Sequence, residues 1–360
     1  AILSSFATPP ILFLPARRKL LRLVLPLLLA FQAAPASAEI LLNGGSITAE
    51  ISFSGEQDEH TFVAEAGDFV NLNVVDLAGS SFAPRLTLVA PDGLVVTSSS
   101  GGTVARLQSF ALPQTGTYTL LVTDGTQSGA QTGIYEVHLA IAPDAAEHGA
   151  LINGGSRFES LTVGDIDSFS FDAVAGTFAN LSVADIGESA LGPRLLLYAP
   201  DGSDLAASVG SNVARLNSFA LPQTGTYTLL VYDGTQSGAQ TGAYEVHLAI
   251  APIAEHGLLL PGIPAFETIT LGDLDTFQFF ALSGALADIS LLEIGTAPLG
   301  PSWWLYGPGG EFLRRATGSS SAEVNNYQLP DTGNYTILVR DATQSGAATG
   351  SYSLEVNLEG

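Results

Sequence analysis

The sequence contains no cysteine and no methionine, and its single lysine is Lys19. Without cysteine, neither a disulfide nor a thiolate-ligated metal site can form. Because exported bacterial proteins often lack cysteine, this absence does not by itself indicate a compartment. The missing methionine means that Ala1 is not an ordinary start, and we expect residues 1–16 to be translated upstream sequence or the remainder of a truncated chain.

Positive charge is scarce as well. The four basic residues of the first 38 positions lie between Arg17 and Arg22, so residues 39–360 carry eight arginines against all 35 carboxylates. A surface of this sign repels phosphate, which excludes nucleic acid as a partner and disfavours an anionic membrane surface. Solubility in salty or extracellular water is the simplest interpretation, and cation binding is the alternative.

No apolar run reaches the length of a membrane span. Residues 17–38 have the parts of a secretory signal, namely a basic start, an apolar run from Leu23 to Phe31, and the small-residue cleavage site Ala36-Ser37-Ala38. The apolar run is about half of the roughly 20 residues that a spanning helix needs. The arginine pair leaves a twin-arginine signal open. Either route predicts a secreted, cell-surface or periplasmic protein with no membrane span in the mature chain.

What the sequence does contain is one unit repeated three times. Residues 213–252 repeat residues 104–143 with three changes in forty positions, and a more diverged copy occupies residues 323–360. The spacing of 108 to 109 residues gives three domains, each large enough to bury its own core. We expect upstream residues and signal peptide at 1–38 and domains at 39–143, 149–252 and 257–360, with short linkers at 144–148 and 253–256 that limit interdomain freedom.

Strand signals inside each unit follow a period of two. Apolar residues recur at every second position along Tyr244, Val246 and Leu248, where the intervening positions are polar, and along Tyr227, Leu229 and Val231, and no segment keeps a period of 3.6. Tight reversals are predicted at Pro91-Asp92-Gly93 and Pro200-Asp201-Gly202. The pattern predicts an all-β fold of three tandem antiparallel β-sandwich, jelly-roll-like domains, in which one face of each sheet is buried and the other is solvated.

Four motifs of the second unit resemble the bacterial pre-peptidase C-terminal domain. They are Gly164 to Phe171, Ala175 to Phe178, Leu197 to Gly202 and Leu221 to Tyr227. The resemblance extends over each of the three repeats almost end to end. It implies a jelly-roll-like sandwich, found as an accessory module on secreted proteases, collagenases and surface proteins, sometimes holding calcium and sometimes binding insoluble substrate. Such modules usually follow a catalytic domain, and none is recognisable in this sequence.

The motif Leu-Pro-x-Thr-Gly occurs once in each repeat, at Leu112 to Gly116, Leu221 to Gly225 and Leu329 to Gly333. A sortase signal has this sequence, but it needs a terminal apolar helix and a basic tail after it, whereas a strand follows each copy here. We therefore predict a corner of the fold. The tyrosine two residues later enters the strand as a tyrosine corner, with its ring inward and its hydroxyl bonded to upstream backbone.

Acidic pairs near the second long strand of each domain are the best candidates for chemistry. Residues two apart on an extended segment project to the same side, so each pair could share a hard cation, and an aspartate opening the Thr-Gln-Ser-Gly loop offers further oxygens. Against this, aspartates at strand ends commonly cap turns. The candidate calcium ligands are Glu56, Asp58, Asp124, Asp165, Asp167, Asp233, Asp273, Asp275 and Asp341.

Other residues give weaker indications. The five histidines show no partner at ligand spacing, which favours structural roles over zinc binding or a catalytic triad. The loop Gly125 to Gly129 lacks the spacing of a nucleophile elbow. Of the adjacent Trp303 and Trp304, we expect one in the core and one facing solvent, on an edge strand or a binding surface. We identify no catalytic residues and expect no cofactor beyond the calcium considered above.

These observations favour an exported, non-catalytic tandem-module protein for binding, adhesion or a structural role at the cell surface. Its partner would be an extracellular protein or polysaccharide, and the oligomeric state stays open. One alternative is the accessory, substrate-binding portion of a secreted peptidase or other hydrolase whose catalytic domain is absent from this chain. Another is a calcium-stiffened subunit of a surface layer or filament.

Overall fold

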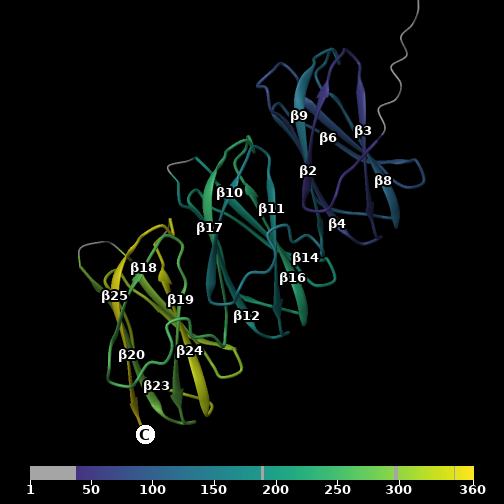
Figure 1. Cartoon of the computed structure of the whole chain (residues 1–360). Helices are drawn as coiled ribbons and strands as arrows, with labels where there is room; N and C mark the ends of the chain where they lie inside the picture. Colours follow the sequence, from purple (N-terminus) through teal and green to yellow (C-terminus); the bar gives the residue numbers. More distant parts are fainter. Residues whose placement is uncertain (1–37, 188–189, 296–298, 344) are drawn as a thin grey trace, which may run out of the picture. The chain divides into compact units, whose positions relative to one another are not determined.

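The computed structural model describes residues 38–187, 190–295, 299–343 and 345–360, which belong to one compact unit (Figure 1). The expected upstream residues and signal peptide lie outside the described residues, apart from Ala38. Every regular element in the described ranges is a β-strand. Accordingly, those ranges include no helix of the length and hydropathy needed to cross a membrane.

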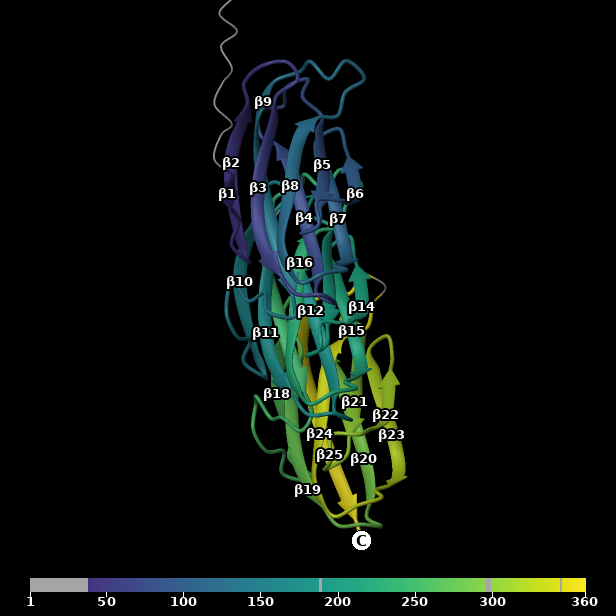
Figure 2. The same ribbon diagram turned by 90° about the vertical axis from the view of Figure 1, so that its right-hand side faces the viewer.

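The first sandwich consists of two sheets. One has the strand order β1-β3-β8-β5-β6, in which only the short β1 is parallel to its neighbour, and the other has the order β2-β9-β4-β7. Figure 2 shows β3, β8, β5 and β6 side by side in the first of these sheets. The strands are β1 (Glu39–Ile40), β2 (Gly45–Ile51), β3 (Gln57–Ala64), β4 (Phe69–Asp76), β5 (Pro84–Val89), β6 (Val95–Ser100), β7 (Val104–Ala111), β8 (Gly116–Asp124) and β9 (Gly133–Ala142).

The second and third sandwiches repeat this topology. Their sheets have the orders β11-β16-β13-β14 with β10-β17-β12-β15, and β19-β24-β21-β22 with β18-β25-β20-β23. The predicted all-β fold of tandem antiparallel sandwiches is therefore confirmed. The strands are β10 (Gly155–Leu161), β11 (Ile166–Ala173), β12 (Phe178–Asp185), β13 (Pro193–Tyr198), β14 (Asp204–Val209), β15 (Val213–Ala220), β16 (Gly225–Asp233), β17 (Gly242–Ile250), β18 (Ala265–Ile269), β19 (Asp275–Ala281), β20 (Leu286–Ile294), β21 (Pro301–Tyr306), β22 (Phe312–Thr317), β23 (Ser321–Gln328), β24 (Gly333–Asp341) and β25 (Gly350–Glu359).

Each sandwich has its own hydrophobic core. In the second sandwich, Tyr227, Leu229 and Val231 of β16 are fully buried and pack with Leu181 and Val183 of β12 from the facing sheet. The first and third sandwiches have equivalent clusters. Burying a large apolar side chain stabilises a fold by about 1.5–3 kcal/mol. The period-two pattern is therefore what closes each pair of sheets.

The Leu-Pro-x-Thr-Gly motifs lie at the corner between two strands, and the tyrosine corner is confirmed. In the second sandwich the hydroxyl of Tyr227 donates to the carbonyl of Gln223 at 2.6 Å and accepts from the N–H of Gln223 at 3.0 Å. Tyr118 and Tyr335 make the same pair of hydrogen bonds. Because the ring is buried and the backbone groups are satisfied, the motif anchors a corner in all three sandwiches.

The expectation of one solvated face per sheet is wrong where sandwiches meet. Strands β16 and β17 are buried on both faces from their third residue onward. Trp304 corrects the sequence interpretation most clearly, because it is only 4% exposed and lies in a cluster with Ala249 and Ala251 of the preceding sandwich. Its partner Trp303 belongs to the core of the third sandwich, as expected. Direct packing between sandwiches covers what a single domain would expose to water.

Candidate functional site

The sandwiches contact one another at two junctions, and both junctions use the same kinds of residue. Small alanines from the end of one sandwich pack against large aromatic and aliphatic side chains of the next. The cluster consists of Ala140, Ala142, Ala145, Ile166, Leu196, Tyr198, Leu230 and Tyr232 at the first junction, and of Ala249, Ala251, Leu274, Trp304, Tyr306 and Leu338 at the second.

A tyrosine of the following sandwich forms hydrogen bonds with the preceding one. The hydroxyl oxygen of Tyr198 lies 2.6 Å from Oγ of Ser109 and 3.1 Å from Nδ2 of Asn71. Ser109 has φ of +46°, beside a register shift between β4 and β7, and its N–H donates to Oδ1 of Asn71 at 3.0 Å. A bulge of this kind redirects a side chain, here toward the junction. The second junction repeats the arrangement with Tyr306, Ser218 and Asn180.

Turn glycines provide the close approach. Gly164 has φ of +73°, and a Cβ there would lie 1.9 Å from Cγ2 of Val75 in the preceding sandwich. At Gly272 a Cβ would lie 2.6 Å from Cβ of Ala184. The equivalent Gly55 has the same turn conformation, with φ of +79°, but no atom within 4 Å of its Cβ position. A glycine is required at this turn in all three repeats because the backbone has a positive φ. Only at the two junctions is it also required because the preceding sandwich packs against it.

Arginine side chains hold the loop that follows the penultimate strand. Nη1 of Arg215 donates to the carbonyl of Asp341 at 2.9 Å, and Nη2 donates to the carbonyl of Gly346 at 2.6 Å. At the first junction the guanidinium of Arg106 lies against Gly238, the glycine equivalent to Gly346. The loops that begin at Asp233 and Asp341, in the second and third sandwiches, therefore contact the preceding sandwich.

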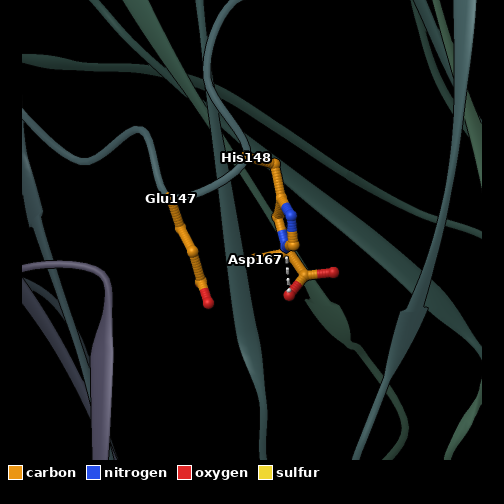
Figure 3. A group of neighbouring side chains, drawn as sticks. All are labelled: Glu147, His148 and Asp167. Atoms are coloured by element: carbon orange, nitrogen blue, oxygen red, sulfur yellow. Dashed lines mark ion pairs between the residues drawn. The ribbon is translucent and has the colours of Figure 1, made fainter.

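Polar groups gather where each linker enters the next sandwich. Nε2 of His148 lies 3.0 Å from Oδ1 of Asp167, and its Nδ1 lies 3.4 Å from Oε1 of Glu159. Figure 3 shows Glu147 and His148 on the linker and Asp167 on the neighbouring strand, with the ion pair dashed. The hydroxyl of Tyr244 donates to the other oxygen of Asp167 at 2.5 Å. Ligand atoms of Glu147, His148 and Asp167 all lie within 4.8 Å of one another.

The second linker reproduces this cluster. Nε2 of His256 lies 3.0 Å from Oδ1 of Asp275, and Tyr352 donates to Oδ2 of Asp275 at 2.6 Å. Glu255 completes a second group of three potential ligands with His256 and Asp275. The ring of His256 also stacks on Phe277, as that of His148 stacks on Phe169. Nothing in the amino-acid spacing alone distinguishes this arrangement from a structural ion pair.

Burial dominates the electrostatics of these clusters. It raises the pKa of Asp167 to about 6, and the neighbouring charge of Asp165 adds to the effect, while hydrogen bonds from Tyr244 and His148 oppose it. The pKa of Asp275 is raised to about 6 for the same reasons. Burial by itself would lower the pKa of His256, but the hydrogen bond and charge of Asp275 outweigh it and raise the pKa.

The first sandwich has a different version of the cluster. Tyr135 donates to Asp58 at 2.7 Å, as in the other repeats, but Ala38 occupies the position of His148. The imidazole comes instead from His60, which replaces the core phenylalanine and lies 2.9 Å from the hydroxyl of Tyr135 through Nε2. Burial lowers the pKa of His60.

On the other side of each linker lies a second histidine. Nδ1 of His138 is 3.4 Å from Oδ1 of Asp165 in the next sandwich, and its Nε2 is 3.6 Å from Oε2 of Glu136. At the second junction, His247 lies 3.6 Å both from Asp273 and from Glu245. Both histidines come from the last strand of one sandwich and face an aspartate of the next.

The predicted calcium ligands are therefore distributed over three settings. Asp58, Asp167 and Asp275 accept a tyrosine hydroxyl, whereas Asp165 and Asp273 cap the preceding turn and face a histidine. Glu56 caps its turn through the N–H groups of Ser52 and Phe53. Asp124, Asp233 and Asp341 each accept hydrogen bonds from their own loop, as in the donation from Thr126 and Gln131 to Asp124.

Sequence reasoning missed the two linker groups. The signal was present, because the linkers share Ala-Glu-His-Gly at 146–149 and 254–257. Interpreting it requires knowing that Asp167 and Asp275 lie beside the linker, which depends on the parallel bridges from Ala150 to Ser170 and from Leu258 to Gln278. Such contacts between strands cannot be inferred from spacing along the chain.

Searches of protein-family models and of curated proteins gave no match for this chain. Solved structures do resemble it. One is the pre-peptidase C-terminal domain of a collagenase from Bacillus anthracis, with 22% identity, 28% of this chain and 92% of that chain covered, and a TM-score of 0.24. Another is a periplasmic inhibitor of g-type lysozyme from Salmonella Typhimurium, with 18% identity, coverage of 29% and 97%, and a TM-score of 0.21.

A third similar structure is a triple jelly roll protein of an archaeal virus turret. It shares 14% identity, with 88% of this chain and 82% of that chain covered and a TM-score of 0.18. At these identities and TM-scores, the likenesses carry no information about function.

Proposed function

We propose that the chain is an exported, non-catalytic array of sandwich modules for binding, adhesion or structural support at the cell surface. One observation carries the proposal, namely that the same tyrosine, arginine and glycine contacts recur at both junctions. Most of the chemically distinctive residues serve to join modules. The expected signal peptide supports export, and an extracellular protein or polysaccharide is the proposed partner.

Repetition suits weak binding by many copies. Joining modules makes the second and third contacts intramolecular, so the whole array binds more tightly than one module does. Cosedimentation with insoluble polysaccharides and fibrous proteins tests this, with the isolated second sandwich (149–252) as the comparison. We expect at least about a tenfold tighter apparent affinity for the whole chain. Equal affinities for a partner would contradict binding through several modules.

The motifs that resemble the pre-peptidase C-terminal domain support a second candidate. In that candidate the chain is the accessory, substrate-binding portion of a secreted hydrolase. The two candidates differ in what lies beside this sequence in the coding DNA. A continuous peptidase domain in the same reading frame favours the accessory role, and a stop codon directly after Gly360 weighs against it.

A further inference from the structure

Each junction has a polar cavity, partly open to solvent, and the two have matching lining. The first has a volume of about 130 Å³ and the second of about 160 Å³, and either is large enough for an ion with bound water. Three carboxylates and one imidazole face each cavity, drawn from both sandwiches and from the linker between them. The lining side chains are Glu136, His138, Glu147 and Asp165 at the first junction, and Glu245, His247, Glu255 and Asp273 at the second.

The histidine in each cavity has a buried nitrogen without a hydrogen-bond partner among the described residues. His138 and His247 are 5% and 6% exposed, and Nε2 of each makes no hydrogen bond within the described residues. The separation of 3.6 Å from that Nε2 to a glutamate oxygen is too long for a hydrogen bond. Two ligands of a tetrahedral zinc ion lie about 3.4 Å apart, given bond lengths of about 2.0–2.1 Å. The pair is spaced for a shared ion.

Charge in the cavities is unbalanced toward the negative. Three carboxylates face one imidazole in each cavity. A cation between these groups would offset the repulsion between the carboxylates.

The linker histidines fit a metal less well. Both nitrogens of His148 already have a carboxylate within 3.4 Å, and the second oxygen of Asp167 accepts from Tyr244. Nε2 of His148 has a carboxylate oxygen at 3.0 Å, although without hydrogen-bond geometry, whereas the carboxylate oxygen paired with Nε2 of His138 is 3.6 Å away.

The glutamate and histidine of each cavity occur together, within the described residues, only where two sandwiches meet. In the third sandwich, Ser353 and Glu355 hold the positions of Glu245 and His247, as the pairing of β20 with β25 shows. The glutamate–histidine pair is therefore a feature of the junctions and not of every sandwich.

We propose that each junction cavity binds one divalent transition-metal cation of the zinc class, through Nε2 of His138 with the Glu136 carboxylate, and through Nε2 of His247 with that of Glu245. Glu147 and Glu255 face the same cavities from the linkers. Asp165 and Asp273 are positioning residues, whose carboxylates lie 3.4 Å and 3.6 Å from Nδ1 and so favour a proton on that nitrogen, which leaves Nε2 free for the ion. An imidazole ligand favours zinc over calcium, which prefers an all-oxygen set. The proposal does not depend on the proposed function.

Isothermal titration of the chelator-stripped chain with Zn²⁺ tests the proposal. We expect two ions per chain, one in His138→Asn, one in His247→Asn and none in the double variant. Co²⁺ supplies a second readout, because its visible spectrum reports nitrogen ligation. We expect each single substitution to halve the intensity. Circular dichroism in chelator checks that the variants fold, and Glu136→Gln with Glu245→Gln replaces them if they do not.

His148→Asn and His60→Asn are the matched controls, and both should keep two ions. Three outcomes would overturn the proposal. The first is no heat of binding at about a tenfold excess of Zn²⁺. The second is loss of the ion in His148→Asn and not in His138→Asn, which would place the metal in the linker cluster. The third is Ca²⁺ occupying the same two sites as tightly as Zn²⁺.

Discussion

Tyr198 reaches across the first junction and places its hydroxyl oxygen 2.6 Å from Oγ of Ser109. The tyrosine ring is fully buried, and the serine has a left-handed backbone that few residues adopt without cost. A strained residue of one sandwich is thus stabilised by a side chain of the next. Junction formation and the local fold of β7 therefore support each other.

Tyr198→Phe removes the hydroxyl and leaves the buried amide of Asn71 with one partner fewer. Because an unsatisfied buried polar group is costly, we expect the free energy of unfolding to fall by about 1–3 kcal/mol. Urea denaturation measures it. Tyr327→Phe is the control, since that half-buried hydroxyl has no hydrogen-bond partner among the described residues, and its substitution should change stability little. Equal effects would mean that the Tyr198 hydroxyl contributes nothing to the junction.

Gly164→Ala and Gly55→Ala separate backbone strain from contact. Both glycines have positive φ, so both substitutions carry the same conformational cost. Only the first adds a methyl group against Val75, 1.9 Å from Cγ2. We expect Gly164→Ala to be less stable than Gly55→Ala by about 1–3 kcal/mol, the usual cost of overpacking. Thermal and urea unfolding of both variants give the difference in stability. A difference near zero would show that the structure around Val75 accommodates the added methyl group without loss of stability.

Arg215→Ala should loosen the loop that it holds in the third sandwich. Two carbonyls, of Asp341 and Gly346, lose their charged donor. Hydrogen bonds from charged groups contribute about 1.5–3 kcal/mol, so we expect faster amide hydrogen exchange in peptides covering this loop. Arg314→Ala, on the exposed face of β22, is the control. Unchanged exchange in the Arg215 variant would show that the loop is held by its own contacts.

The sandwich fold could be predicted from the sequence because its cause is local. Alternation along Tyr227, Leu229 and Val231 needs only a period of two, and the corner at Leu221 to Gly225 recurs in each repeat. Trp304 marks where this reasoning fails. Its burial depends on Ala249 and Ala251 of another sandwich, and no pattern within one repeat specifies that partner.

The candidate site was predictable only in part. Asp165 and Asp167 were identified from their spacing, and the structure places each beside a histidine from outside its own strand. His138 gave no signal by itself, and the shared Ala-Glu-His-Gly of the linkers marked His148 without indicating its partner. The contact of His138 with Asp165 follows from how the second sandwich packs on the first.

Stability should fall as pH rises from about 4 to 7. The pKa values of Asp167 and Asp275 are raised from 3.8 to about 6, so these carboxyls bind protons more tightly in the folded chain than in the unfolded one. Where the folded state binds more protons, the free energy of unfolding decreases with pH. One pKa unit corresponds to about 1.4 kcal/mol, so each group contributes on the order of 2–3 kcal/mol below pH 4, which is lost by pH 6 to 7. The raised pKa of His256 acts in the same direction above about pH 6.5.

The double variant Asp167→Asn and Asp275→Asn isolates this effect. Asparagine still accepts the hydroxyl hydrogens of Tyr244 and Tyr352 but cannot ionise, so the slope of stability against pH should flatten between pH 4 and 6. Asp201→Asn is the control, because hydrogen bonds from Ser203 and Gln223 lower the pKa of this exposed carboxyl, the opposite direction to Asp167 and Asp275. Urea denaturation at several pH values in the presence of chelator gives the slopes. A double variant with the unmodified slope would show that other groups set the pH dependence.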